Sequence, residues 1–298
     1  MPSKRSYVIR WGIWLRRKLV PAHKMTIQQI REAFDALLKK VKIPEGVDIT
    51  RVALNGILCE KTTPENPENG VVLFVHGGGF CIGSLEGYRS LAGYIALEVN
   101  RTTISVDYKL APEFPFPAGL NDVVSVYEAL LKDHKPSEIA LFGDSAGGGL
   151  VLSTLLKLKE DKLPVPSCAV LVCPWVDLTF SGKSYLEARR KDPMLSKAGL
   201  EDFARKYLNG TPETNHYASP LFGDLSDLCP LMIQAGEHDV LRSDSETLAE
   251  KALKAGVEVN MKVWKGMFHV WQFYVRILPE ARQSLVEIGV YVKNKMKP

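Results

Sequence analysis

The sequence has few cysteines, and they form no recognisable pattern. Five cysteines are scattered over 298 residues, their number is odd, and no C-x-x-C pair occurs. A secreted disulfide framework and a structural zinc site both need cysteines at regular spacing. We therefore expect free thiols in a cytoplasmic protein, with no disulfide framework and no metal.

Long uncharged apolar runs are also missing. The most apolar stretch near the start, YVIRWGIWLRRKLV at residues 7–20, is interrupted by Arg10, Arg16 and Arg17. A spanning helix needs about 20 apolar residues, and a signal peptide needs an unbroken apolar region before a cleavage site. We therefore expect no stable membrane insertion and no secretory leader.

Charge of one sign does not dominate the chain. It carries 38 basic and 34 acidic residues, a net charge of +4, with the basic excess divided between the two ends. A nucleic-acid-binding surface normally shows a concentrated basic patch. We therefore expect no nucleic-acid partner.

The sequence does contain a regular alternation of short apolar runs and amphipathic segments. Such alternation is typical of βαβ units, in which a mostly parallel sheet is covered by helices on both faces. In these α/β folds ligands bind beyond the carboxyl ends of the strands. The predicted strands are 71–77, 102–108, 139–144, 168–174, 231–237 and 258–264, and the predicted helices are 88–100, 118–133, 145–160, 245–256 and 271–295.

The region before this alternation has a different pattern. It predicts two amphipathic helices, 7–20 and 26–40, with Thr26 as the N-cap of the second and Pro21 between them. A strand pair follows, joined by a turn or bulge at Asn55-Gly56. These segments precede the regular βαβ part of the chain.

The segment GDSAG at 143–147 contains a candidate nucleophile, Ser145. The motif G-x-S-x-G is weak alone, but here a strand precedes it and a helix follows it. A sharp strand-to-helix turn exposes the serine hydroxyl, and side chains at Gly143 or Gly147 would collide with the neighbouring strand and helix. The alternatives are a glycine-rich turn with Ser145 as N-cap, or a phosphate-binding loop. The phosphate loop is disfavoured because G-x-x-x-x-G-K-[ST] is absent.

A serine hydroxyl needs a base, and the base needs an orienting acid. His269 and Asp239 each lie directly after a predicted strand, so both are expected at the same edge of the sheet as Ser145. The chain order serine, acid, histidine is that of α/β-hydrolases. We expect the remaining candidates to be caps, packed residues or surface residues: His23, His76, His134, His216, His238, Glu237, Asp244 and Asp177.

Together these motifs resemble the hormone-sensitive-lipase family of α/β-hydrolase esterases. The resemblance covers about residues 50 to 295, and it is carried by HGGGF at 76–80, DYKLAPEFPFPAGLND at 107–122, GDSAGG at 143–148, HDVLRSD at 238–244 and GMFHVW at 266–271. It implies an eight-stranded, mostly parallel sheet with a helical cap. The implied organisation is N-terminal cap helices in 1–45, a catalytic core in 46–177 and 221–298, and a cap insertion in 178–220.

The resemblance also implies roles for individual residues. Ser145, His269 and Asp239 are the implied triad, and the amides of Gly78, Gly79 and Ala146 form the implied oxyanion hole. His76 is then a structural residue that orders the glycine loop. The sequence departs from the family pattern at Lys109, Phe114 and Val240, where arginine, histidine and proline are usual.

Substrate contacts are expected around these motifs and from the N-terminal helix. We assign them to Phe80 and Asp144, and to Trp11 and Trp14. The aromatic helix that carries the two tryptophans could pack on the core, lie on a membrane surface or cover an acyl pocket. The resemblance favours the lid, while the flanking arginines keep the membrane surface as an alternative.

The predicted activity is hydrolysis of short- to medium-chain acyl esters through an acyl-enzyme, with no cofactor. Lactones or amides are alternative substrates for the same site. A metal-dependent hydrolase is disfavoured because H-E-x-x-H and H-x-H are absent. A non-catalytic binding protein is disfavoured because all three triad residues are present. We also expect a homodimer formed through the edge of the last strand.

Overall fold

The fold is built around one eight-stranded sheet, seen in a computed structural model that describes residues 1–19 and 25–296. The strand order is β1-β2-β4-β3-β5-β6-β7-β8. Strand β2 runs antiparallel to β1 and β4, and every other pair is parallel. This confirms the predicted mostly parallel α/β sheet. The strands are β1 Val47–Leu54, β2 Ile57–Pro64, β3 Val71–Val75, β4 Thr102–Val106, β5 Ile139–Asp144, β6 Cys168–Val172, β7 Leu231–Gly236 and β8 Val259–Trp264.

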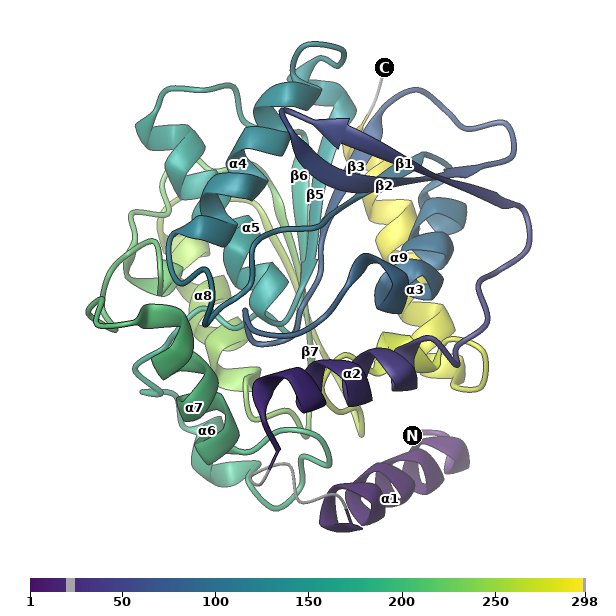
Figure 1. The fold of residues 1–298 in the computed structure, drawn as a ribbon, viewed down its shortest axis with the longest axis vertical. Coiled ribbons are helices and arrows are strands. Elements are labelled where there is room, and N and C mark those ends of the chain that lie inside the picture. Colours follow the sequence, from purple (N-terminus) through teal and green to yellow (C-terminus); the bar gives the residue numbers. More distant parts are fainter. Residues whose placement is uncertain (20–24, 297–298) are drawn as a thin grey trace.

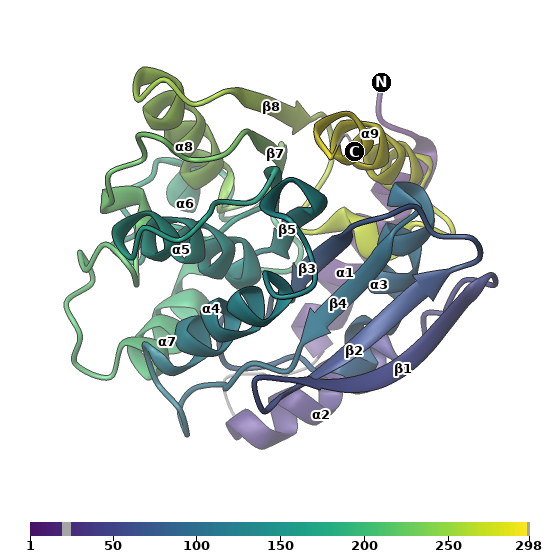
Figure 2. The ribbon, with the colours of Figure 1, turned by 90° about the horizontal axis from the view of Figure 1, so that it is seen from above.

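Helices cover both faces of this sheet, as Figures 1 and 2 show. On one face α4, α5 and α8 pack on the sheet, and on the other α3 and α9 lie side by side. The α-helices are α1 Lys4–Leu19, α2 Ile27–Leu38, α3 Leu85–Val99, α4 Ala118–Leu130, α5 Ala146–Glu160, α6 Ser184–Glu187, α7 Lys197–Leu208, α8 Arg242–Lys254 and α9 Pro279–Lys295. Short 3₁₀ helices are η2 Pro136–Glu138, η3 Pro220–Phe222 and η4 Trp271–Tyr274.

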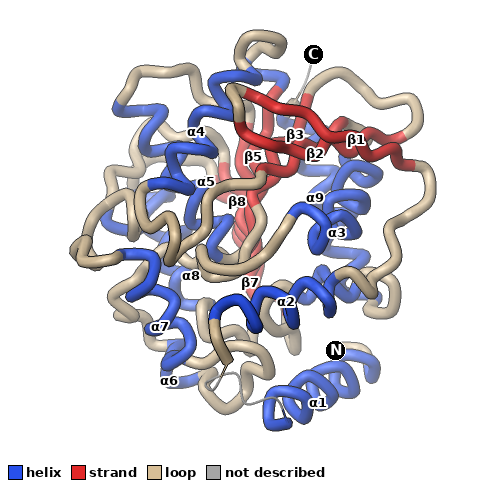
Figure 3. The backbone as a smooth tube through the Cα atoms, in the orientation of Figure 1, coloured by secondary structure: helices blue, strands red, loops and turns tan. Residues whose placement is uncertain are grey.

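The central strands are almost entirely apolar because both of their faces are buried. Every residue of β3, β5, β6 and β7 is buried. Burial on two faces removes the polar alternation of a half-exposed strand. The tube in Figure 3 shows these strands enclosed by helices.

The first hairpin and the cap of α2 follow the sequence prediction. Strands β1 and β2 are joined by Asn55 and Gly56, both at positive φ (46° and 80°), as a tight two-residue hairpin turn requires. The Thr26 side chain accepts from the Gln29 amide, and the Gln29 side-chain oxygen accepts from the Thr26 amide, which completes a capping box. Pro21 and His23 lie outside the described residues.

The predicted final helix, 271–295, is wrong in its first part. Residues 271–274 form the 3₁₀ helix η4, and α9 begins only at Pro279. Proline has no amide hydrogen and is favoured in the first turn of a helix, which explains the start of α9. The segment after His269 thus forms a separate element, η4, which lies against the carboxyl end of α2.

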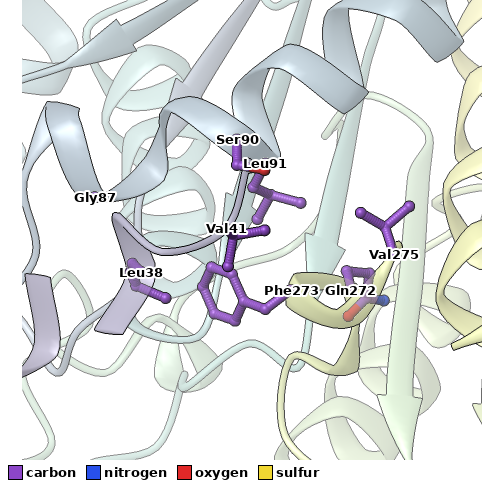
Figure 4. A pocket seen from close by; sticks show the side chains of 8 residues that line it. All are labelled: Leu38, Val41, Gly87, Ser90, Leu91, Gln272, Phe273 and Val275. Atoms are coloured by element: carbon purple, nitrogen blue, oxygen red, sulfur yellow. The ribbon is translucent and has the colours of Figure 1, made fainter. Parts of the chain in front are cut away.

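Helix α2 packs against α3 and η4 at its carboxyl end. Leu38 and Val41 meet Leu91 of α3 and Phe273 of η4 around a small pocket, shown in Figure 4. The Phe273 ring also contacts Tyr88 of α3, with centroids 5.3 Å apart. Apolar packing therefore joins α2 to the segment that follows His269.

Within residues 1–19 and 25–296, each helix falls short of the length or the apolarity that a bilayer crossing requires.

Candidate active site

Ser145 lies in the turn between β5 and α5, in a backbone conformation that few residues adopt. Its φ is 53° and its ψ is −123°. Its amide donates to the Val172 carbonyl at 2.8 Å, and its carbonyl accepts from the Trp175 amide at 2.9 Å. These bonds to the neighbouring strand and loop maintain a turn that would otherwise relax.

The glycines on either side of Ser145 permit this turn. A Cβ atom at Gly147 would overlap the Val75 carbonyl oxygen of β3, and one at Gly143 would overlap the backbone of Gly147. The predicted collisions with the neighbouring strand and helix are therefore confirmed.

His269 and Asp239 form a buried hydrogen-bonded pair. His269 Nδ1 lies 2.9 Å from Asp239 Oδ2, and the second carboxylate oxygen accepts from the Leu241 amide at 2.8 Å. The Asp239 side chain is fully buried. A carboxylate in this position directs the Nδ1–H toward itself and leaves Nε2 free to accept a proton.

The acidic surroundings of His269 favour its protonated form. Burial alone would lower the pKa of His269, but the charge of Asp239 and its hydrogen bond, with Asp192 and Asp144 nearby, raise the pKa above its ordinary value of 6.5. The positive charge that the imidazole gains as a base is therefore stabilised.

The HGGG loop is fastened to the nucleophile turn by Asp144. The Gly77 amide donates to Asp144 Oδ1 at 3.0 Å, and the Tyr88 hydroxyl donates to Oδ2 at 3.2 Å. Gly78 has a φ of 115°, and a Cβ there would overlap the Ile82 carbonyl. The loop and Ser145 are thus positioned relative to each other by one carboxylate.

His76 and Asp144 are both buried, and burial favours the neutral form of each: it lowers the pKa of His76 and raises the pKa of Asp144. The pKa of His76 falls to about 4, which keeps the ring neutral while its Nδ1–H donates to the Gly77 carbonyl at 2.7 Å. Burial raises the pKa of Asp144 to about 7, although the Gly77 amide, His269 and Tyr88 oppose the shift. His76 therefore orders the loop and does not act as a second base.

Ser145 and His269 open into one cavity of about 900 Å³. Gly78, Gly79 and Asp144 line it at the catalytic end. Its outer wall comes from α2 and α7, from the segments directly before them, and from Arg17 of α1. The apolar side chains of this wall are Met25, Ile27, Ile30, Phe34, Met194, Leu195, Leu200 and Phe203, and its charged side chains are Arg17, Asp202 and Lys206.

Three residues expected to contact substrate do not line this cavity in the described structure. Phe80 is buried among aromatic rings. Its ring centroid lies 3.9 Å from that of Tyr207 and 5.4 Å from that of Trp175. Trp11 and Trp14 lie on the outer side of α1, where they are 63% and 39% exposed. Of the four expected substrate contacts, only Asp144 lines the cavity.

The structure also brings to the site two residues that the sequence did not single out. Asp192 is buried, and its carboxylate accepts from the Val240 amide at 3.0 Å and from the Leu195 amide at 2.9 Å. Burial and the charge of Asp239 raise the pKa of Asp192 to about 6. A proline at position 240, the usual residue in the family pattern, would have no amide to donate. The departure at Val240 therefore has a structural use.

Cys173 is the second such residue. It lies at the end of β6 with a φ of 48°, and its Sγ accepts from the Val270 amide at 3.4 Å.

The acids that the sequence left as alternatives to Asp239 serve as acceptors for backbone amides. Asp244, for example, accepts from the amides of Val176 and Asp177.

Cys173, Asp239 and His269 form one group whose geometry could suit a metal. Their ligand atoms lie within 4.8 Å of one another. Burial, reinforced by the charge of Asp239, raises the pKa of the Cys173 thiol well above its ordinary value. Metals bind the thiolate, and the His269 nitrogen nearest Asp239 is already hydrogen-bonded to it. The group is better suited to orienting an imidazole than to binding a metal.

Comparison with known proteins identifies the family to which the chain is similar. The family described as alpha/beta hydrolase fold matches residues 72–273. An acetyl-hydrolase of Streptomyces hygroscopicus is 34% identical over 276 residues, which cover 92% of this chain and 90% of that protein. An esterase of Acinetobacter venetianus is 32% identical, and the aligned region covers 95% of this chain and 97% of that esterase.

A solved structure gives the same result at the level of the fold. The crystal structure of an esterase from the bacterial hormone-sensitive lipase family superposes with a TM-score of 0.95 and is 34% identical, and each chain is covered completely.

Proposed function

The chain belongs to the hormone-sensitive-lipase-like branch of the α/β-hydrolase fold family and is a serine carboxylic ester hydrolase, and from this premise we propose that Ser145, His269 and Asp239 hydrolyse short- to medium-chain acyl esters. The observation that carries the proposal is the convergence on one cavity of a strained serine and a histidine whose other nitrogen is paired with a buried carboxylate.

The reaction proceeds in two halves. Ser145 Oγ attacks the ester carbonyl carbon while His269 Nε2 takes the hydroxyl proton, and the tetrahedral intermediate collapses as His269 gives that proton to the leaving alcohol. In the second half His269 takes a proton from water, and the hydroxide attacks the acyl carbon. The intermediate then releases the carboxylic acid as Ser145 regains its proton. In both halves the Asp239 carboxylate orients His269 and stabilises the imidazolium.

The oxyanion of each tetrahedral intermediate needs preorganised donors. We assign this role to the amides of Gly78, Gly79 and Ala146. Ala146 is the first residue of α5, so its amide has no partner within the helix. Each such donor contributes about 3 kcal/mol to lowering the barrier. The bond from Gly77 to Asp144 keeps the glycine loop beside Ser145 before substrate arrives.

The cavity supports a limit on acyl chain length. Ile30 and Phe34 of α2 and Leu200 and Phe203 of α7 line the cavity, so apolar side chains of two cap helices bound the space for the acyl chain. Apolar side chains suit acetyl to octanoyl groups, since each buried methylene contributes about 0.8 kcal/mol until the wall is reached. The relative that is an acetyl-hydrolase supports the short end of this range.

Steady-state kinetics on p-nitrophenyl acetate, butyrate, octanoate and palmitate test the proposal. We expect kcat/KM to be highest among the first three esters and to fall sharply for palmitate. Ser145→Ala should lower kcat by a factor on the order of 10⁴ or more. The proposal fails if Ser145→Ala retains the wild-type rate, or if palmitate is the best substrate. Butyrolactone and N-butyryl anilide are measured beside the esters. A kcat/KM for either that exceeds the values for the esters would identify lactone or amide hydrolysis as the main activity.

A further inference from the structure

Helix α1 exposes an apolar stripe on the side that faces away from the protein. No other helix of the described ranges exposes more than two large apolar side chains. The spacings of three, four and seven residues place these side chains on one side of the helix. This outer stripe consists of Tyr7, Val8, Trp11, Trp14, Leu15 and Leu19.

The opposite side of α1 is fastened to the protein. Ser3 donates from its amide and its hydroxyl to the Glu280 carboxylate, at 2.5 and 3.0 Å. Ile9 and Ile13 are partly buried and pack against a core cluster that includes residues of α3 and α9. Arg17 donates to two backbone carbonyls of the segment before α7. The orientation of α1 is thus fixed, and its packing on the protein does not use the tryptophans.

The charges of α1 are all positive. The helix reads KRSYVIRWGIWLRRKL, with six basic and no acidic residues. Lys4 and Arg5 lie at its amino end, where a positive charge opposes the helix dipole, so helix stability does not account for them. Lys4 and Lys18 flank the outer stripe at its two ends, and Lys18 Nζ lies 3.8 Å from the centre of the Trp14 ring.

We propose that the outer stripe docks α1 flat on an anionic phospholipid surface. Tryptophan and tyrosine favour the boundary between headgroups and acyl chains, and lysine and arginine at the margins reach the phosphates. Pairing of two outer stripes would bring Lys4 and Lys18 of both copies together, so charge complementarity favours an anionic lipid over a second copy of this chain. The proposal does not depend on the ester chemistry assigned above.

Docking in this orientation brings the catalytic cavity to the lipid. Arg17 of α1 lines the cavity, and α2, which follows in the chain, supplies Ile27, Ile30 and Phe34 to the same wall. Figure 1 shows α1 beside α2 at one end of the molecule, away from β1 and β2. An amphiphilic ester at the lipid surface would thus lie near the cavity wall.

Vesicle binding followed by tryptophan fluorescence tests this surface. Trp175, Trp264 and Trp271 are already buried, so a blue shift on adding vesicles reports on Trp11 and Trp14. We expect a blue shift and co-sedimentation with vesicles of phosphatidylcholine mixed with phosphatidylglycerol. Phosphatidylcholine alone should give little of either, and added salt should weaken the binding to mixed vesicles.

Two pairs of variants separate the stripe and its charges from general surface effects. Trp11→Ser with Leu15→Ser is compared with Leu253→Ser and Val286→Ser, which alter exposed apolar residues of α8 and α9. Lys4→Gln, Arg16→Gln and Lys18→Gln are compared with Gln at three exposed lysines elsewhere: Lys61, Lys162 and Lys293. Each positive charge near an anionic surface raises the partition coefficient about fivefold. The triple variant of α1 should therefore lower the partition coefficient roughly 100-fold, and the triple variant at the control lysines should leave it unchanged.

Thermal unfolding monitored by circular dichroism verifies that each variant is folded. The proposal is overturned if the wild type does not bind the mixed vesicles, or if the α1 variants bind as well as their controls. It is also overturned if Trp11→Ser halves the mass measured by light scattering, because the stripe would then be an interface between copies.

Discussion

At the scale of single residues, the structure explains how the histidine is tuned as a base. Asp239 binds His269 through one oxygen and the Leu241 amide through the other, so its carboxylate cannot rotate freely. Asp192 and Asp144 add negative charge nearby. Together these groups orient the ring and raise its pKa.

The first prediction concerns pH. His269 must be neutral to accept the Ser145 proton, and its pKa is raised above 6.5. Activity should therefore be lost as pH falls through this raised value, with half-maximal kcat/KM above pH 6.5. Asp192→Asn removes one of the charges that raise the pKa of His269, so the acidic limb of this variant should move to lower pH. A pH–rate profile with p-nitrophenyl butyrate measures both, and a shift of the variant to higher pH would contradict the account.

Cys173 provides a second prediction at this scale. Its Sγ accepts from the Val270 amide and so fixes the backbone directly after His269. Cys173→Ala should lower kcat about tenfold with little change in KM, because the imidazole is misplaced while the cavity is intact. Cys173→Ser should recover most of the rate, since its hydroxyl can accept the same bond. Cys168→Ala, at another buried cysteine whose thiol faces Ser167, is the control. Equal losses in both alanine variants would indicate a general packing effect.

At the scale of secondary-structure elements, α2 connects the cap to the catalytic residues. Its capping box fixes where it begins, its apolar face lines the cavity, and its carboxyl end packs on Phe273 of η4. A substitution on the cavity face of α2 should therefore alter substrate size before it alters chemistry.

Ile30→Trp tests this expectation. The larger side chain should fill part of the cavity, so kcat/KM for p-nitrophenyl octanoate should fall at least about tenfold relative to acetate, the loss expected for a few unfavourable methylene contacts. Ile43→Trp places the same ring at an exposed position after α2 and should leave the ratio unchanged. A ratio that stays constant in Ile30→Trp would show that α2 does not limit chain length.

Elements were predictable where a local pattern specified them. The buried strands β3, β5 and β7 follow from short apolar runs, and Ser145, Asp239 and His269 follow from their positions at strand ends. Asp192 was not predictable, because it lies in an irregular segment and binds the Val240 amide, next to Asp239, only through tertiary folding. The outward direction of Trp11 was missed for a related reason, since α1 has apolar residues on both sides and only Ile9 and Ile13 face the core.

At the scale of the whole molecule, the sheet has one edge suited to self-association. Strand β8 is the last in the order and pairs only with β7 in the described residues. Its Asn260 and Val263 are exposed. An unpaired edge of this kind can accept a second strand.

We predict a homodimer through this edge. Light scattering at micromolar concentration should give twice the 33.1 kDa mass of one chain. Val263→Lys should shift the mass toward that of a monomer, because it places two like charges close together across the paired strands. Leu58→Lys, on β2 away from this edge, is the matched control. A wild-type mass of one chain would contradict the prediction.

The central claim is that Ser145 is the nucleophile, and covalent labelling tests it most directly. The protein is treated with an organophosphate such as diethyl p-nitrophenyl phosphate, which transfers its phosphoryl group to an activated serine, and the product is analysed by intact mass and peptide mapping. The account predicts one adduct per chain, located on Ser145, with loss of esterase activity in proportion to labelling and no adduct in Ser145→Ala. Labelling at another residue with parallel loss of activity, or stoichiometric labelling of Ser145 with activity retained, would contradict it.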